Sequence, residues 1–403
     1  MERVPPGTSA GPKRRQPTAP AKPQHGRRVL SHRTLKAKIV RSLASQGFRI
    51  KGGHILPPAS LTKDTIRRLH QTAVEHKRER AKKGLATEEP RLLSRIASGD
   101  EIVPEEISPR LIEVLPGSEE ELLFRYATLH WSVPVSSGYG RRLRFLVLDD
   151  SNHKLIGVIG LGDPVIALAP RDCWIGWDRR DRETRLRYVM DAFVLGTVPP
   201  YSQLLCGKLV AMLAASNEVR TAFARKYGGA QPRIRRTPHD GRLALITTTS
   251  ALGRSSLYNR LRFKDRLLYQ SVGFTGGSGE FHFSNGLYSS IFNFATEHCA
   301  PTYRRREWGD GFRNRREVLK KALPLIGLPR AWLQHGIERE VFVVPLAHNT
   351  REFLRGEHSR LRLFDSPAYE LIQYFRERWL LPRAQRDPSY RNWSREEYAI
   401  WLK

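Results

Sequence analysis

Apolar residues in the first part of the chain recur at helical spacing. Leu35, Ile39 and Leu43 follow one another four residues apart after Ser31, and Gly47 is a residue type that often ends a helix. The pattern therefore predicts a helix from about Ser31 to Gly47. Two further helices are expected before a linker near residue 108, over 61–83 and 90–98.

The expected helix over 61–83 has a narrow apolar stripe and a broad basic face. Ile66, Leu69 and Val74 form the stripe, and most other positions are Arg, Lys, His or small polar residues. Such a face suits contact with a phosphate backbone, and it equally suits exposure to solvent. The pattern alone leaves both interpretations open.

From residue 143 the pattern changes to strands rich in Val, Ile and Leu. Two such segments, 143–149 and 154–162, are separated by the turn-forming residues Ser151, Asn152 and His153, which predicts an antiparallel hairpin. Three further strands are expected, over 188–198, 243–250 and 339–346.

Helices are expected between and after these strands. Ser202 is a residue type that caps helices, and the leucines after it predict one helix that continues to Gly228. Residues 268–285 predict a strand, a glycine-rich turn and a second strand, on which Glu280 and His282 would face the same side. Shorter helices are expected over 178–186, 255–261, 313–323, 367–379 and 395–402.

Together these elements predict an α/β protein with a mixed, mostly antiparallel twisted sheet flanked by helices. The first segment is rich in Pro, Lys and Arg and has almost no large apolar residues, so it cannot bury enough surface to order itself. The expected parts are a disordered basic arm (1–28), a helical N-terminal region (29–109), an α/β core (110–300) and a basic C-terminal extension of helices and a strand (301–403).

The net charge indicates the kind of partner. The chain has 69 Lys and Arg residues against 40 Asp and Glu residues, a formal net charge of +29. Such cations repel one another across a Debye length of about 8 Å unless counterions or a polyanion neutralise them. Nucleic acid is therefore the first partner expected, DNA before RNA, and an acidic protein is the alternative.

Two groups of arginines are the candidate contacts with nucleic acid. One lies in the expected basic arm, and the other is interleaved with Tyr303, Trp308 and Phe312, a mixture that suits phosphates and bases together. The alternatives are an unused tail for the first group and a solvated helix face for the second. The candidate residues are Arg14, Arg15, Arg27, Arg28, Arg304, Arg305, Arg306, Arg313, Arg315 and Arg316.

Cysteine usage and hydropathy indicate a compartment. Only Cys173, Cys206 and Cys299 occur, without a close pair or a zinc-like spacing, so we expect reduced thiols and no metal site. No apolar run approaches the roughly 20 residues of a membrane span, and the first residues lack the hydrophobic core of a secretion signal. The expected location is the cytoplasm, with no membrane partner.

Residues 143–263 resemble the core of the N-acetyltransferase (GNAT) superfamily. The resemblance rests on the strand that runs into VPPYSQLLCGKL at 198–209, on FARKYG at 223–228 and on SSLYNRLRF at 255–263. It implies a GNAT-like sheet in which a loop and a helix N-terminus bind the pyrophosphate of acyl-coenzyme A. The matching positions in this chain are Ser202, Gln203 and Gly207.

This loop departs from the superfamily pattern. Leu204, Leu205 and Cys206 stand in the segment where the superfamily places closely spaced glycines. We therefore expect no cofactor, with acyl-coenzyme A as the alternative. Within the superfamily the chain is similar to the phage Mu Mom-type DNA-modifying proteins, which also have Pro and Ser before an ungapped helix.

Two residues are candidates for catalysis. The resemblance implies that Tyr258 matches the tyrosine that gives a proton to the departing thiolate, and Asp191 on the central strand is the natural general base. The residues alone leave alternatives open. Tyr258 could close the edge of the core, and Asp191 could pair with Arg185 or Arg187.

A longer stretch, residues 110–354, resembles the DruA family of the Druantia antiphage defence systems. The residues that carry this resemblance are RDCWIGWDRRDRETRL at 171–186, TTSALGRSSLYNRLRF at 248–263 and VFVVPLAHNTREFLRGE at 341–357. It implies a role in prokaryotic antiviral defence, together with a helicase-like partner and other system proteins.

The main hypothesis is a defence component that binds nucleic acid through a basic surface on a GNAT-like core. Whether it is an enzyme stays open. The alternatives are an N-acyltransferase-like enzyme that modifies nucleic acid and a non-catalytic scaffold for the other defence proteins.

Overall fold

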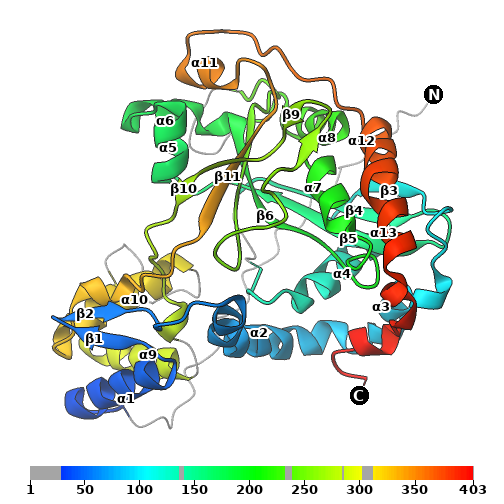
Figure 1. Ribbon diagram of the computed structural model, residues 1–403. Helices are drawn as coiled ribbons and strands as arrows, with labels where there is room; N and C mark the ends of the chain where they lie inside the picture. Colours follow the sequence, from blue (N-terminus) through cyan, green and yellow to red (C-terminus); the bar gives the residue numbers. More distant parts are fainter. Residues whose placement is uncertain (1–28, 136–139, 232–237, 284–285, 302–311, 403) are drawn as a thin grey trace, which may run out of the picture.

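A seven-stranded sheet forms the centre of the fold (Figure 1). The computed structural model describes residues 29–135, 140–231, 238–283, 286–301 and 312–402. The strand order is β10-β11-β7-β6-β5-β4-β3, and all neighbours are antiparallel except β6 and β7. The strands are β3 (Pro109–Glu113), β4 (Arg142–Asp149), β5 (Lys154–Gly162), β6 (Val189–Thr197), β7 (Leu245–Thr249), β10 (Gln270–Phe274) and β11 (Glu340–Pro345). The expected mixed, mostly antiparallel sheet is confirmed.

The hairpin of β4 and β5 forms as the sequence predicts. The two strands pair from Arg142 with Gly162 to Asp149 with Lys154. Asn152 closes the turn, because its Oδ1 accepts a hydrogen bond from the Lys154 N–H at 3.0 Å.

The neighbouring strand β6 contains a bulge at Phe193. Between the paired residues Gly160 and Leu161 of β5, the register skips Phe193 on β6. A Cβ atom on Gly160 would lie 2.6 Å from the Phe193 ring, and one on Gly162 would lie 3.2 Å from it. The aromatic ring therefore occupies the space that side chains of β5 would fill.

One face of the sheet, called the α7 face, is covered by helices that follow β6 and by helices near the C-terminus. Ile159, Met190 and Ile246 of the sheet share a buried cluster with Leu209 and Phe223 of these helices. The covering helices are α7 (Cys206–Leu213), α8 (Asn217–Tyr227), α12 (Ala368–Phe375), the π-helical turn η6 (Arg376–Leu380) and α13 (Leu381–Arg386).

The opposite face, called the α4 face, has two separate apolar clusters. Leu146 and Val158 pack with Phe124 of α4, whereas Leu245 packs with Phe353 of α11. The helices on this side are α3 (Glu89–Leu93), α4 (Glu119–Ala127), α5 (Ala169–Ile175), α6 (Arg179–Arg185) and α11 (Thr350–Arg355).

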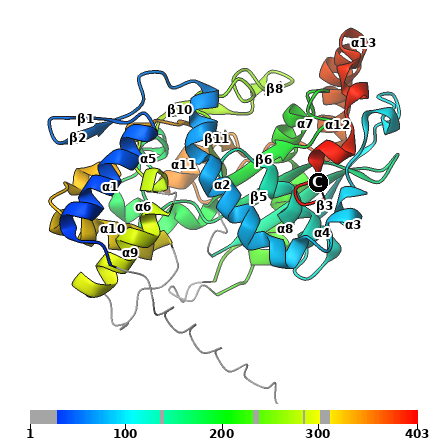
Figure 2. The ribbon, with the colours of Figure 1, turned by 90° about the horizontal axis from the view of Figure 1, so that it is seen from below.

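A smaller lobe lies beside the sheet and has its own core (Figures 1 and 2). Leu35, Ile39 and Leu43 are buried there against Phe294 and Leu319. The lobe joins the start of the described chain to the segment between β10 and β11. Its elements are α1 (His32–Ser45), β1 (Arg49–Lys51), β2 (His54–Leu56), α9 (Leu287–His298) and α10 (Phe312–Leu325).

This packing groups residues differently from the four parts expected from the sequence. The helix α1 packs on α9 and α10, outside the expected region 29–109, and β11 lies beyond residue 300 yet pairs inside the central sheet. The physical reason is that apolar spacing identifies the buried face of a helix but not the element that covers it.

The helix α2 (Lys63–Leu85) connects the lobe with the sheet (Figure 2). Ile66 and Leu69 belong to the core of the lobe, and Leu85 belongs to the cluster beneath α4. Between these ends most side chains are exposed or only partly buried. The expected basic helix is confirmed, and its middle is available for contacts other than packing.

The helix expected from Ser202 to Gly228 is two helices. Leu205 has a φ of +63°, so α7 begins only at Cys206. Ser216 caps α8 by accepting a hydrogen bond from the Val219 N–H at 3.4 Å. The prediction placed the cap at Ser202 because its residue type fits, although Ser216 performs that role.

The second strand expected after the glycine-rich turn is absent from the described segment up to residue 283. Residues 281–283 form a single 3-10 turn, in which His282 Nε2 lies 2.8 Å from the Trp332 carbonyl oxygen. Glu280 and His282 therefore do not share a strand face. The expected C-terminal helix over 395–402 shortens to one 3-10 turn, Arg395–Tyr398.

Short elements complete the described chain. No helix in the described ranges is long and apolar enough to span a bilayer. The short elements are β8 (Arg262–Phe263), β9 (Arg266–Leu267), η1 (Gly99–Glu101), η2 (Thr128–His130), η3 (Leu186–Tyr188), η4 (Phe281–Phe283), η5 (Arg330–Leu333), η7 (Pro388–Asn392) and η8 (Arg395–Tyr398).

A methyl group on β5 should disturb the packing of Phe193. Gly160→Ala is expected to lower the free energy of unfolding by about 1–3 kcal/mol, because its Cβ would overlap the ring. Chemical denaturation measures the change. The control is Gly84→Ala in α2, where a Cβ meets nothing within 4 Å and should stabilise the helix by about 0.5–1 kcal/mol. Equal effects of the two substitutions would contradict the packing described.

Candidate nucleic-acid interface

A groove of about 520 Å³ lies between α2, α4 and the α4 face of the sheet. We call it the α2 groove. The helix α2 forms one wall, α4 and η2 form the other, and β4 and β6 form the floor. Its lining residues are Lys77, Arg80, Ala81, Leu85, Glu121, Phe124, Arg125, Thr128, Leu129, Val135, Arg142, Arg144 and Phe193.

The strand register builds the floor of the α2 groove. Arg142 pairs with Gly162 and Arg144 pairs with Gly160, so each arginine of β4 faces a glycine of β5. The Phe193 ring of β6 covers these glycines. An aromatic ring therefore lies beside two guanidinium groups on one face of the sheet.

The walls of the α2 groove are strongly basic. Five lining residues are basic, namely Lys77, Arg80, Arg125, Arg142 and Arg144, and the one lining carboxylate, among described residues, is that of Glu121. An Arg144 nitrogen lies 2.8 Å from the Glu121 carboxylate. This ion pair neutralises one positive charge, and Lys77, Arg80 and Arg125 still give the groove a surplus that favours an anionic ligand.

Lys77 is held at the edge of the α2 groove. Its Nζ donates a hydrogen bond to the Val135 carbonyl oxygen at 2.6 Å. Burial lowers the pKa of Lys77 to about 8, because the charged form loses hydration. Arg80 and Arg125 are exposed on opposite walls and keep their guanidinium groups open to solvent.

This combination of groups suits a nucleic acid. Guanidinium and ammonium groups on two walls can contact a sugar–phosphate backbone, and an aromatic ring on the floor can stack against a base. A groove of this volume lies within the usual range for ligand sites.

Asp191 lies on β6 beyond the residues that line the α2 groove, on the same face of the sheet. It pairs with Gly162, the partner of Arg142, so the two side chains are two strands, or about 10 Å, apart on the α4 face. Thr247 donates a hydrogen bond to the Asp191 carboxylate at 2.8 Å. Burial raises the pKa of Asp191 to about 6, although that hydrogen bond and the nearby Arg171 guanidinium oppose the shift. Arg171, rather than Arg185 or Arg187, is the arginine that influences Asp191.

Tyr258 lies on the other face of the sheet. Its ring stacks on Tyr269 with centroids 4.6 Å apart, within the buried cluster of the α7 face. Burial raises the pKa of Tyr258 to about 12. Thr247 and Thr248 are consecutive on β7, so their side chains point to opposite faces of the sheet. Thr247 bonds Asp191 on one face, whereas Thr248 interacts with Tyr258 on the other. The structure does not bring the two candidate catalytic residues together.

The loop that matches the superfamily's pyrophosphate site is closed on itself. Every backbone N–H from Ser202 to Cys206 donates to a carbonyl of the same segment, at 2.9–3.3 Å. Leu257 lies against Gly207, and Arg383 Nε donates to the Gln203 carbonyl oxygen at 3.0 Å. The amides from Ser202 to Cys206 therefore cannot hold the pyrophosphate of acyl-coenzyme A without losing these bonds.

The expected arginine contacts fall mostly outside the described part of the chain. Arg14, Arg15, Arg27, Arg28, Arg304, Arg305 and Arg306 lie outside it, as does the side chain of Arg313.

The other two arginines of that cluster are described and contact the protein itself. Arg315 lies over the Tyr288 ring at 4.3 Å, and Arg316 donates to Ser278 Oγ at 2.7 Å. The charges of both act on the buried carboxyl of Glu280, whose pKa burial raises to about 7. The described residues contain no group of three or more His, Cys, Asp or Glu side chains able to hold a metal ion.

Sequence reasoning missed the floor of the α2 groove. Arg142 and Arg144 alternate along one strand, and Gly160 and Gly162 alternate along the next, so period-two spacing placed each pair on one face. Alternate glycines in a buried strand are a signal that a large ring covers it. Which ring covers them depends on the bulge at Phe193, which the sequence does not show.

Comparison with known proteins identifies a family and a relative. The family model described as "Druantia protein DruA" matches residues 60–356. A curated protein of Escherichia coli (strain UMEA 4076-1), named Druantia protein DruA, is 41% identical over 362 residues, which cover 89% of this chain and 89% of the relative. No solved structure matches the chain significantly.

The raised pKa of Asp191 should appear in the pH dependence of stability. The pKa of Asp191 is about 6 in the folded protein, against 3.8 for an ordinary aspartate. The contribution of Asp191 to the free energy of unfolding is therefore fully present below pH 3.8 and is lost as pH rises through 6. Asp191→Asn does not titrate, so its stability relative to the parent should rise by about 2 kcal/mol from pH 4 to pH 8. Denaturant unfolding across this range measures the difference.

Asp240→Asn is the control for that experiment. Burial alone would raise the pKa of Asp240, but its hydrogen bonds with Arg242 and Tyr188 lower it. The relative stability of Asp240→Asn should therefore fall as pH rises only below about pH 4, and it should stay nearly constant from pH 4 to pH 8. A stability difference for Asp191→Asn that is constant across the pH range would show that Asp191 titrates as an ordinary carboxyl.

Proposed function

This chain belongs to the DruA family, and from that premise we propose that it acts in Druantia antiphage defence by binding nucleic acid in the α2 groove. DNA is the ligand proposed before RNA. Membership of the family supports the role in a defence system. The binding activity is our inference from the groove.

The observation that carries the proposal is the surplus of positive charge on a preformed, partly aromatic surface. The α2 groove holds five basic side chains against one carboxylate among its described lining residues, and Phe193 lies on its floor. The charges come from α2, α4 and β4, so folding gathers them. A basic surface of this kind binds phosphates without regard to sequence, and a stacking ring adds affinity for unpaired bases.

The strand arrangement supports a GNAT-like core. A run of antiparallel strands, one parallel pair and a loop leading into a helix after the central strand are what the sequence resemblance implies. The bulge at Phe193 lies on that central strand. We propose that this core serves as a scaffold for binding instead of acyl transfer, because the loop from Ser202 to Cys206 has no free amides for a pyrophosphate.

Other contacts complete the proposal. The arginines of the N-terminal segment and of 304–306 would add phosphate contacts around the groove. The partners would be other proteins of the defence system, including one resembling a helicase. Such a complex would act in the cytoplasm, where invading nucleic acid is exposed.

Removing charge from the α2 groove should change the salt dependence of binding. Arg80→Gln and Arg125→Gln should each weaken binding of labelled DNA and reduce the slope of log affinity against log salt by about 1. Fluorescence anisotropy at several salt concentrations measures the slope for single strands and duplexes. Arg110→Gln is the control, because Arg110 pairs with Asp150 at 2.7 Å at the sheet edge. Slopes that do not change in the two groove variants would refute the assignment.

Lys77 should make binding depend on pH. Its pKa of about 8 means that the groove gains a positive charge as pH falls from 9 to 7. DNA affinity should therefore increase over this interval, by up to about tenfold for one added phosphate contact. Lys77→Arg keeps its charge throughout and should flatten the profile. If the parent protein and Lys77→Arg show the same dependence of DNA affinity on pH, Lys77 is excluded from the interface.

A further inference from the structure

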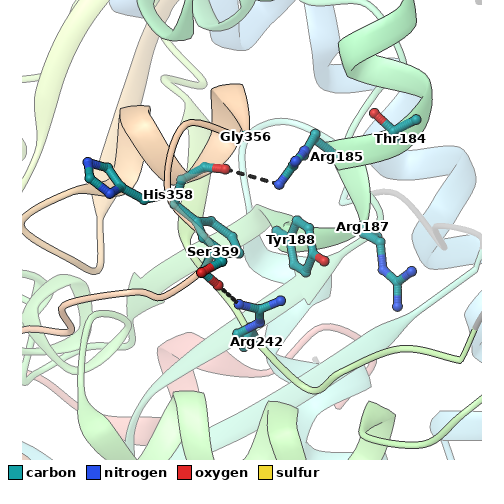
Figure 3. A pocket seen from close by; sticks show the side chains of 9 residues that line it. Thr184, Arg185, Arg187, Tyr188, Arg242, Gly356, His358 and Ser359 are labelled. Carbon is teal, nitrogen blue, oxygen red and sulfur yellow. Dashed lines mark hydrogen bonds between the residues drawn. The ribbon is translucent and has the colours of Figure 1, made fainter.

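A second basic pocket lies at the start of β6, away from the α2 groove. It has a volume of about 380 Å³. Figure 3 shows that its side chains come from the end of α6, from the residue Arg242 before β7 and from the segment after α11. We call it the arginine pocket. Its lining residues are Thr184, Arg185, Arg187, Tyr188, Arg242, Phe353, Gly356, His358 and Ser359.

The arginine pocket has three guanidinium groups and, among the residues that the structure describes, no lining carboxylate. All three arginines donate to backbone carbonyl oxygens, and the acceptor of Arg242 is the Ser359 oxygen. Arg185 donates to the Phe353 oxygen at 3.2 Å, and Arg187 donates to the Pro238 oxygen. A carbonyl fixes a guanidinium without neutralising it, so both charges remain available to an anion.

Arg242 forms the third side of the pocket and has a carboxylate partner. Asp240 accepts hydrogen bonds from Arg242 and, at 2.9 Å, from the Tyr188 hydroxyl. The Tyr188 ring lies near both Arg187 and Arg242, each 5.5 Å from its centroid. The aromatic ring and the carboxylate therefore hold the guanidinium groups in position, and the pocket keeps a net positive charge.

Neighbouring acids are engaged elsewhere. Glu357 pairs with Arg355 at 2.5 Å, and Asp172 pairs with Arg171 at 2.7 Å and with Arg182 at 3.1 Å. These carboxylates are already committed to arginines that do not line the pocket.

Two structural details indicate a preformed site. Gly356 has a φ of +85°, and a Cβ at this position would lie 2.4 Å from Arg185 Nη2. Glycine thus lets the guanidinium approach the turn after α11 closely. The Arg187 Nε is buried and lacks a hydrogen-bond partner within the described structure. A buried donor without a partner is costly, so the fold holds Arg187 in this position at the expense of one hydrogen bond.

We propose that the arginine pocket binds a phosphomonoester, the terminal phosphate of a nucleotide or of a nucleic-acid end. The guanidinium groups of Arg185 and Arg187 can donate to the oxygens of such a group, and the exposed Ser359 hydroxyl can add a hydrogen bond. The activity is distinct from backbone binding in the α2 groove, because it recognises the extra charge of a chain terminus.

Calorimetric titration of the full chain with thymidine 5′-monophosphate tests the proposal, with thymidine as the ligand control. The monophosphate should bind and thymidine should not. Arg187→Gln and Arg185→Gln should each weaken binding by roughly ten- to hundredfold, as expected for a lost charge-assisted pair. The matched control is Arg180→Gln, which removes an exposed arginine of α6 outside the lining. Thermal melting of each variant establishes that it is folded.

A second arm separates the two sources of phosphate. A short single-stranded DNA with a 5′-phosphate is compared with the same strand bearing a 5′-hydroxyl. If the pocket recognises ends, Arg187→Gln abolishes the preference for the phosphorylated strand, whereas Arg80→Gln in the α2 groove weakens both strands equally and keeps the preference. Binding of the monophosphate alone identifies a free nucleotide as the ligand.

The proposal fails if neither the monophosphate nor the 5′-phosphate gives binding that Arg185→Gln and Arg187→Gln weaken. This outcome leaves the salt dependence of the α2 groove unaffected, so the two proposals fail independently.

Discussion

The site depends on how the central strand β6 pairs with its two neighbours. On one side it is antiparallel to β5 almost along its full length, and on the other it is parallel to β7 over only Val189–Asp191. The bulge at Phe193 interrupts the antiparallel side. A bulge adds one residue to one strand and shifts the alternation of side chains beyond it. Phe193 and its neighbour Val194 both contribute to the α4-face cluster as a result.

Glycine makes this arrangement sterically feasible. Gly160 and Gly162 leave room for the Phe193 ring, and Gly196 leaves room for Trp131, whose ring would lie 2.5 Å from a Cβ there. The aromatic rings thus cover the parts of β5 and β6 that these glycines leave open. The same glycines face Arg142 and Arg144 across the hairpin, which places charge and aromatic surface side by side.

Polar contacts hold the long helix α2 and the C-terminal segment in place around this face. Burial, with the charge of Arg339, lowers the pKa of His70 on α2 to about 3, so its imidazole is neutral and lies 3.0 Å from an Arg339 nitrogen. At the other end, the buried Glu89 carboxylate accepts hydrogen bonds from three successive backbone amides, Ile400 to Leu402, at 2.6–2.9 Å. Because α2 is buried only near its ends, its basic middle can serve the groove.

Local structure and chemical character follow from the order of the residues along the chain. Apolar spacing located α1, α2, the β4–β5 hairpin and β6, the charge balance indicated an anionic partner, and the quoted motifs identified the family. The tertiary structure decided which residues meet. It placed Asp191 and Tyr258 on opposite faces, closed the loop at Ser202–Cys206 on itself, and gathered arginines from distant segments into two pockets. The physical reason is that side-chain periodicity is a local property, whereas strand register, bulges and helix partners are set by contacts between segments far apart in the chain.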